Sequence, residues 1–251
     1  MPLEELASER QRLFKEMEQS DQFPSHALQV RFSAILQDYE REEVSVPAME
    51  AEGPDVNVEG LFVFVWYHSH KIAASFIHGQ IQQALVHGEA ARSVGRLPYN
   101  SADFDAVRML FDGLAHVEAY RFGTASGRRH DRKHIKRVRG CIKVLAWLSR
   151  TATDFCLGKF HLLRAELLSL GKNKNKRFVE IVQLYKSAVA LSCKGGLLMD
   201  EAVANELAGK YLMSVRGTSS GRPYLEEACA LYQKWGARAK TKSLRAHLAK
   251  I

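Results

Sequence analysis

The chain has 251 residues, 46% of them hydrophobic and 25% charged, which is ordinary usage for a globular protein with one large domain or two small ones. The formal net charge of +8 permits contact with nucleic acid or acidic lipid without requiring it. The four cysteines form no CxxC pair, which argues against a zinc ribbon or a redox pair, so we expect reduced, buried thiols.

Targeting signals are not evident in the sequence. The N-terminus is charged and lacks the apolar core of a signal peptide. The longest apolar run, 61–67 (LFVFVWY), is far shorter than the roughly 20 residues that span a bilayer. We therefore expect a cytoplasmic protein that makes no membrane contact.

Periodic hydrophobic spacing predicts helices along most of the chain. An N-terminal helical arm covers 1–42, with helices at 3–19 and 26–41, and a linker rich in proline, glycine and acidic residues covers 43–60. A helical-repeat domain is predicted over 61–251. Its expected helices are 61–76, 80–93, 102–122, 132–151, 154–170, 178–193, 199–214, 222–234 and 237–250, with loops at 123–131 and 215–223. The run 61–67 also has strand propensity, but a lone strand would lack a partner, which favours a helix.

Three of these helices share a ladder of residues spaced four and three apart, which places each set on one helix face. The ladders are Ala84, Gly88 and Ala91; Ile181, Tyr185 and Ala188; and Ala228, Tyr232 and Trp235. They begin 97 and 47 residues apart, so a helix pair within 102–151 would supply a missing unit. The pattern predicts an all-α, tetratricopeptide-like solenoid of antiparallel helix pairs, an α-α superhelix. An irregular helical bundle is the alternative.

The C-terminal part of the chain also resembles a known family. The motifs DEAxANELA at 200–208, with Tyr211, and YxxWGAxAK at 232–240 resemble the helical-repeat region of large predicted-ATPase signalling proteins. Those proteins are similar to multisensor hybrid histidine kinases and serine/threonine kinases. The resemblance covers roughly residues 133–248 and makes Asn205 and Tyr211 structural residues of the repeat. It implies a non-catalytic scaffold for signal transduction, whose partners are other proteins or neighbouring ATPase and kinase domains.

The catalytic parts of that family are missing from this sequence. It has no GxxxxGK[ST] motif, no His-Glu phosphoacceptor box, and no HRD or DFG triad. The chain ends at Ile251, before a sensor or kinase domain could start, so we expect an array separated from its catalytic neighbours, either as a fragment or as a stand-alone protein. We expect no cofactor, and contact with partners through the concave face of the array. An enzyme with an unrecognised site is a lesser alternative.

The segment 127–143 (GRRHDRKHIKRVRGCIK) is the strongest candidate binding site, because it holds eight Arg or Lys residues and one acid. The candidate anion or nucleic-acid patch comprises Arg128, Arg129, Arg132, Lys133, Lys136, Arg137 and Arg139. Apolar residues keep helical spacing through the segment, so a solvated helix face is favoured and a nucleic-acid-binding protein is the alternative. No aromatic residue lies within the segment to stack on bases.

His68 and His70 form an HxH pair that invites comparison with a metal site. On a helix, side chains two residues apart point about 200° away from each other, which suits one metal ion poorly. We therefore expect neither a metal ligand nor a catalytic residue in this chain.

Overall fold

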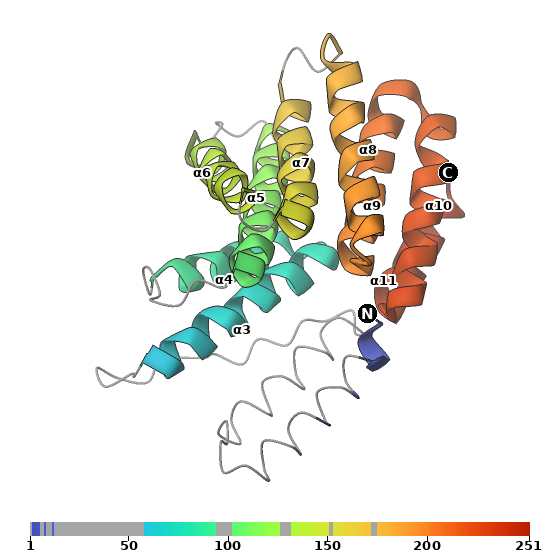
Figure 1. Cartoon of the computed structure of the whole chain (residues 1–251). Coiled ribbons are helices and arrows are strands. Elements are labelled where there is room, and N and C mark those ends of the chain that lie inside the picture. The colour runs from blue at the N-terminus through green and yellow to red at the C-terminus, as the bar shows by residue number, and fades with distance from the viewer. Residues whose placement is uncertain are drawn as a thin grey trace.

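The computed structural model describes residues 2–5, 8, 12, 58–93, 102–125, 132–150, 153–171 and 175–251. These residues form helices and turns, with no strand among them, so the predicted all-α class is confirmed. The helices of the main body are α3 (Val58–Ile77), α4 (Ile81–Ser93), α5 (Ala102–Ala125), α6 (Arg132–Leu148), α7 (Thr153–Ser169), α8 (Phe178–Lys194), α9 (Leu198–Arg216), α10 (Thr218–Trp235) and α11 (Arg238–Leu248) (Figure 1). The strand-prone run 61–67 lies inside α3.

Several boundaries differ from the sequence prediction. Helix α3 begins inside the predicted linker 43–60, and α5 continues into the predicted loop 123–131. The helix predicted at 26–41 lies outside the described residues, and the one at 3–19 is described only at residues 3–5, 8 and 12, which are helical.

The predicted loop 215–223 is wrong. Only Gly217 separates α9 from α10, with a φ of 90° that other residues rarely adopt. Pro223 lies within the second turn of α10, where its ring removes one backbone donor without ending the helix. The glycine, serine and proline residues of this segment therefore predict a longer loop than the single residue found.

Consecutive helices pack as pairs: α3 with α4, α5 with α6, α7 with α8, and α9 with α10. The first helices of successive pairs also contact one another, α3 with α5, α5 with α7, and α7 with α9. The second helix of each pair then contacts the first helix of the next, and α11 packs against α10 (Figure 1). The pairs are thus stacked in chain order, and each contacts its neighbours.

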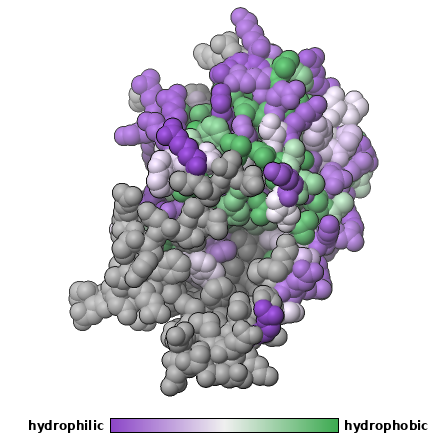
Figure 2. Space-filling view, in the orientation of Figure 1, coloured by the Kyte–Doolittle hydropathy of each residue, from purple (hydrophilic) through white to green (hydrophobic). Residues whose placement is uncertain are grey.

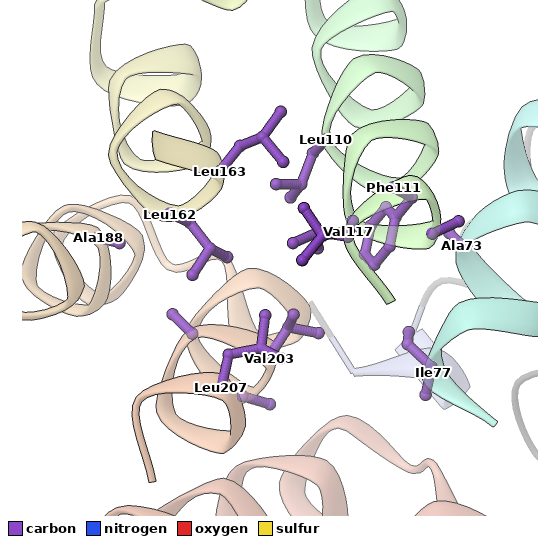
Figure 3. Close-up of a cluster of buried hydrophobic side chains, with 14 of the residues drawn as sticks. Ala73, Ile77, Leu110, Phe111, Val117, Leu162, Leu163, Ala188, Val203 and Leu207 are labelled. Carbon is purple, nitrogen blue, oxygen red and sulfur yellow. The ribbon is translucent and has the colours of Figure 1, made fainter. Parts of the chain in front are cut away.

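First and second helices differ in how they are buried. In α5 every residue from 109 to 117 is buried, and in α9 every residue from 202 to 209 is buried, as expected for helices enclosed on several sides. The second helices are amphipathic; α6, for example, buries Val138, Cys141, Leu145 and Leu148 on one side. The core runs through the first helices, where side chains from α3, α5, α7 and α9 meet (Figure 3).

All nine ladder residues are buried, on α4, α8 and α10, which are second helices. The pair α5–α6 occupies the place of the missing unit between the first two ladders. Val138 and Cys141 of α6 precede Tyr185 and Ala188 by 47 residues and are buried like them. The register predicted from the sequence therefore continues through α6.

Two glycines allow the backbones of α9 and α10 to approach closely. A Cβ on Gly221 would lie 2.3 Å from the carbonyl oxygen of Gly209, and a Cβ on Gly209 would lie 2.9 Å from that of Gly221. Any side chain at Gly221 would push the two backbones apart, because real Cβ atoms do not approach backbone so closely. These glycines set the spacing of the last pair.

The N-terminus meets the C-terminal end of the stack. Leu3 is buried and lies against Gly236, at the turn between α10 and α11. Glu4 pairs with Arg238 at the surface. Among the described helices, none has the length and apolar character of a bilayer-spanning segment.

Candidate functional site

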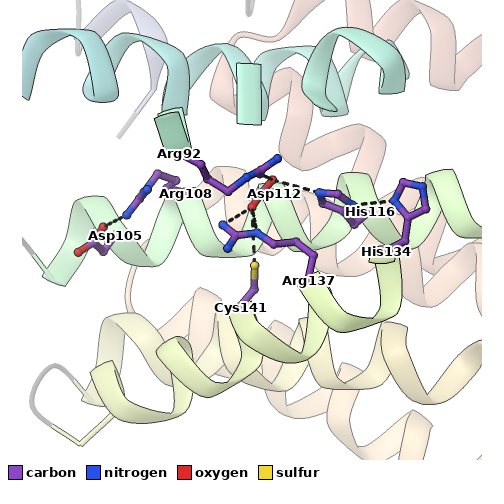
Figure 4. A network of polar contacts seen from close by, with 8 residues as sticks. All are labelled: Arg92, Asp105, Arg108, Asp112, His116, His134, Arg137 and Cys141. Carbon is purple, nitrogen blue, oxygen red and sulfur yellow. Dashed lines mark hydrogen bonds and ion pairs between the residues drawn. The ribbon is translucent and has the colours of Figure 1, made fainter. Parts of the chain in front are cut away.

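A buried aspartate joins three helices near the middle of the stack. Asp112 of α5 accepts hydrogen bonds from Arg92 of α4, at 2.7 Å, and from Arg137 of α6, at 2.5 Å (Figure 4). The thiol of Cys141 lies 3.8 Å from the same carboxylate. Burial raises the pKa of Asp112, but the two arginines outweigh that effect and lower it, so the carboxylate is held charged.

Gly88, a ladder residue, makes room for this arrangement. A Cβ at Gly88 would lie 2.5 Å from Oδ1 of Asp112, so a larger residue on α4 would displace the carboxylate from its arginines. The small residue predicted from the ladder therefore serves an ion pair as well as helix packing.

Arg137 was predicted to belong to the basic patch, but it does not lie on that surface. Its side chain turns inward to Asp112, and the pKa of the guanidinium is raised, because Cys141 and Asp112 outweigh the burial that would lower it. It is therefore an interhelical ion-pair residue. Arg132, Lys133, Lys136 and Arg139 lie exposed on α6, whereas Arg128 and Arg129 lie outside the described residues.

A glutamate occupies the comparable place in the next pair. Glu166 of α7 accepts a hydrogen bond from the hydroxyl of Tyr185, the middle ladder residue of α8. Arg121 of α5 pairs with the same carboxylate at 2.6 Å. Burial and the neighbouring Glu166 raise the pKa of the Tyr185 phenol, so the hydroxyl keeps its proton and remains a donor.

The last pair repeats the arrangement with Glu206 of α9. Its carboxylate accepts a hydrogen bond from Tyr232 of α10 at 2.8 Å and contacts Lys240 of α11 at 2.8 Å and Lys210 at 2.7 Å. Burial raises its pKa, but Lys210 and Lys240 outweigh burial and lower it to about 2. Asn205 instead donates to the carbonyl of Glu201 within its own helix. The buried polar residue that reaches the next element is therefore Glu206.

Each of these three acids links its own helix to two others. A further ion pair, between Lys159 of α7 and Asp200 of α9 at 2.6 Å, joins two first helices. Removing one partner of such a buried pair costs about 3–5 kcal/mol, because a buried charge is left uncompensated. The acids are enclosed and already paired, which suits them to joining helices rather than to meeting a substrate.

Two histidine pairs link first helices to second helices. His68 of α3 faces His87 of α4, with 2.9 Å between Nδ1 atoms, and His116 of α5 faces His134 of α6 at 2.7 Å. Burial, with smaller contributions from neighbouring Lys71 and from the partner imidazole, lowers the pKa of His87 to about 4. The pKa of His68 is also about 4, mainly because of burial.

His68 and His70 point in different directions, as helix geometry predicts. His68 faces His87 of α4, whereas the ring of His70 lies 4.5 Å from that of Trp66. In the part of the chain that the structure describes, no group of three or more His, Cys, Asp or Glu side chains is arranged to hold a metal ion.

The cysteine prediction holds at three positions of four. Cys141, Cys156 and Cys229 are buried free thiols, whereas Cys193 is exposed near the end of α8. An amphipathic helix has a solvent-facing side, and the apolar sequence around Cys193 does not reveal that this residue lies on it.

Sequence reasoning missed one residue of the basic helix. Trp147 lies four residues after Lys143 on α6, just past the segment 127–143, and its side chain is 54% exposed. The i to i+4 spacing from Lys143 is the signal that could have identified it.

Comparison with protein-family models, with curated proteins and with solved structures finds no match to this chain.

Proposed function

We propose that the chain is a tetratricopeptide-like array of four helix pairs, with α11 as its terminal cap, and that it serves as a non-catalytic interaction scaffold. The observation that carries this proposal is the stacking of the pairs in chain order, with enclosed first helices and amphipathic second helices. Stacking of that kind lets units that cannot bury their own apolar faces share one continuous core.

We infer that partners bind the second helices of this scaffold, in place of the concave face expected from the sequence. The long buried stretches of α5 and α9 leave little of those first helices to a partner, whereas α6, α8 and α10 expose one side. The sequence resemblance suggests what the partner is: an ATPase or kinase domain of a signalling protein. The scaffold would relay the state of one such domain to another without reacting itself.

This proposal is tested with purified components. The full chain is mixed with the ATPase and histidine-kinase domains encoded nearest to it in its genome, and binding is measured by calorimetry together with the ATP hydrolysis of each domain. We expect binding to at least one domain, a changed rate of hydrolysis, and no hydrolysis by the chain alone. The proposal would be contradicted if the chain bound neither domain, or if the isolated chain hydrolysed ATP.

A further inference from the structure

The outward side of α6 combines positive charge with an exposed aromatic ring. Arg132, Lys136, Arg139, Lys143 and Trp147 are all exposed and follow one another at intervals of three or four residues. At 3.6 residues per turn they fall within an arc of about 80° and extend for about 22 Å along the helix. We call these five residues the α6 stripe.

Two features separate the α6 stripe from an ordinary solvated helix face. Helix α6 contains no acidic residue, so none of its own side chains neutralises the four cations. Its one inward cation, Arg137, is paired with Asp112, and its buried residues, Val138, Cys141, Leu145 and Leu148, occupy the opposite side. Figure 2 shows hydrophilic residues gathered at the upper left, where α6 lies in Figure 1.

Trp147 points to the chemistry of the ligand. A row of cations alone attracts any polyanion, including an acidic protein. An exposed indole that continues such a row adds a flat surface on which a nucleobase can stack, worth about 1–3 kcal/mol per base. The second acid-free helix, α11, is also basic but carries no Phe, Tyr or Trp. Among the described helices, therefore, the α6 stripe alone meets both requirements.

We propose that the α6 stripe binds single-stranded nucleic acid, with phosphates on Arg132, Lys136, Arg139 and Lys143 and an unpaired base stacked on Trp147. A single strand fits better than a duplex, because paired bases are already stacked and do not offer their faces to a side chain. The proposal is independent of the signalling role proposed above.

The test uses the full chain with oligo-U and oligo-dT, monitored by the anisotropy of a label on the oligonucleotide and by tryptophan fluorescence. Trp147 is 54% exposed, Trp235 is 6% exposed and Trp66 is partly buried, so base stacking should quench emission chiefly from Trp147. Neutralising four phosphates predicts a slope of about −3 in a plot of log affinity against log salt.

Variants of equal charge change identify the site. Lys136→Glu with Lys143→Glu should weaken binding at least tenfold, while Lys186→Glu with Lys234→Glu, exposed on α8 and α10, should change it less than twofold. Trp147→Ala should weaken binding by about 5- to 150-fold and abolish the quenching. Circular dichroism of each variant verifies that it is folded.

Three results would overturn the proposal. The first is no binding at low salt. The second is an equal loss in the α6 and control variants. The third combines two observations: polyglutamate or duplex DNA binds as tightly as the single strand, and Trp147→Ala has no effect on binding. That result would assign the α6 stripe to acidic partners in general.

Discussion

Replacing Glu206 by glutamine tests whether the buried acids hold the helices together. Glu206 is 5% exposed and accepts contacts from α9, α10 and α11. Its pKa of about 2, against an ordinary 4.5, corresponds to about 3 kcal/mol in favour of the charged carboxylate in the folded chain. Glutamine keeps the shape of the side chain and removes the charge, so Glu206→Gln should lower the free energy of unfolding by about 3 kcal/mol at pH 7.

The sign of the pH dependence follows from the lowered pKa. The contribution of Glu206 is fully present above the ordinary pKa of 4.5 and is lost as the pH falls toward 2, because the unfolded chain takes up the proton first. The free energy of unfolding of the wild type should therefore converge on that of Glu206→Gln at low pH. Urea denaturation followed by circular dichroism measures both quantities.

Glu226→Gln is the matched control. Glu226 also pairs with a cation four residues away, Arg222 at 2.8 Å, but its side chain is 53% exposed. Exposed pairs of this kind contribute less than about 1 kcal/mol. If Glu206→Gln costs no more than this control, or if its cost does not shrink at low pH, then Glu206 does not join the helices electrostatically.

Three further predictions concern packing and titration. Trp235→Ala should cost about 3–5 kcal/mol in chemical denaturation, because the ring is 6% exposed, and a loss below about 1 kcal/mol would contradict its place in the ladder. Gly221→Ala should lower the free energy of unfolding by about 1–3 kcal/mol, because the new Cβ forces α9 away from α10. Gly140→Ala is the control: no atom lies within 4 Å of its new Cβ, so it should raise the free energy of unfolding by up to about 1 kcal/mol. Equal effects of the two substitutions would refute the close contact. His87 has its pKa lowered to about 4, so the unfolded chain binds protons first and the melting temperature should fall as the pH drops from 6.5 toward 4. His87→Gln should flatten that fall, and an unchanged slope in thermal melts would show that His87 does not cause it.

Local spacing was sufficient to predict much of the fold. The burial of Ala84, Tyr185 and Trp235 follows from a repeated interval along a helix, which the sequence displays directly. The same reasoning placed a helix pair between the first two ladders, where α5 and α6 lie.

The polar contacts could not be predicted in the same way. Arg137 stands among seven other cations of 127–143, and only the packing of α6 on α5 brings it to Asp112, which lies 25 residues away along the chain. The break at Gly217 was overestimated because neighbouring serine and proline residues indicate a loop, although one residue with positive φ is enough to end a helix.

Amide hydrogen exchange of the Glu206→Gln variant under native conditions tests the stacked array most directly. In an array each pair depends on its immediate neighbours, so destabilising one pair should open that region before the rest. We predict that amide protection falls in α9, α10 and α11 and stays close to the wild-type value in α3 and α4. An equal loss of protection in all of these helices would contradict the array and indicate one cooperative core.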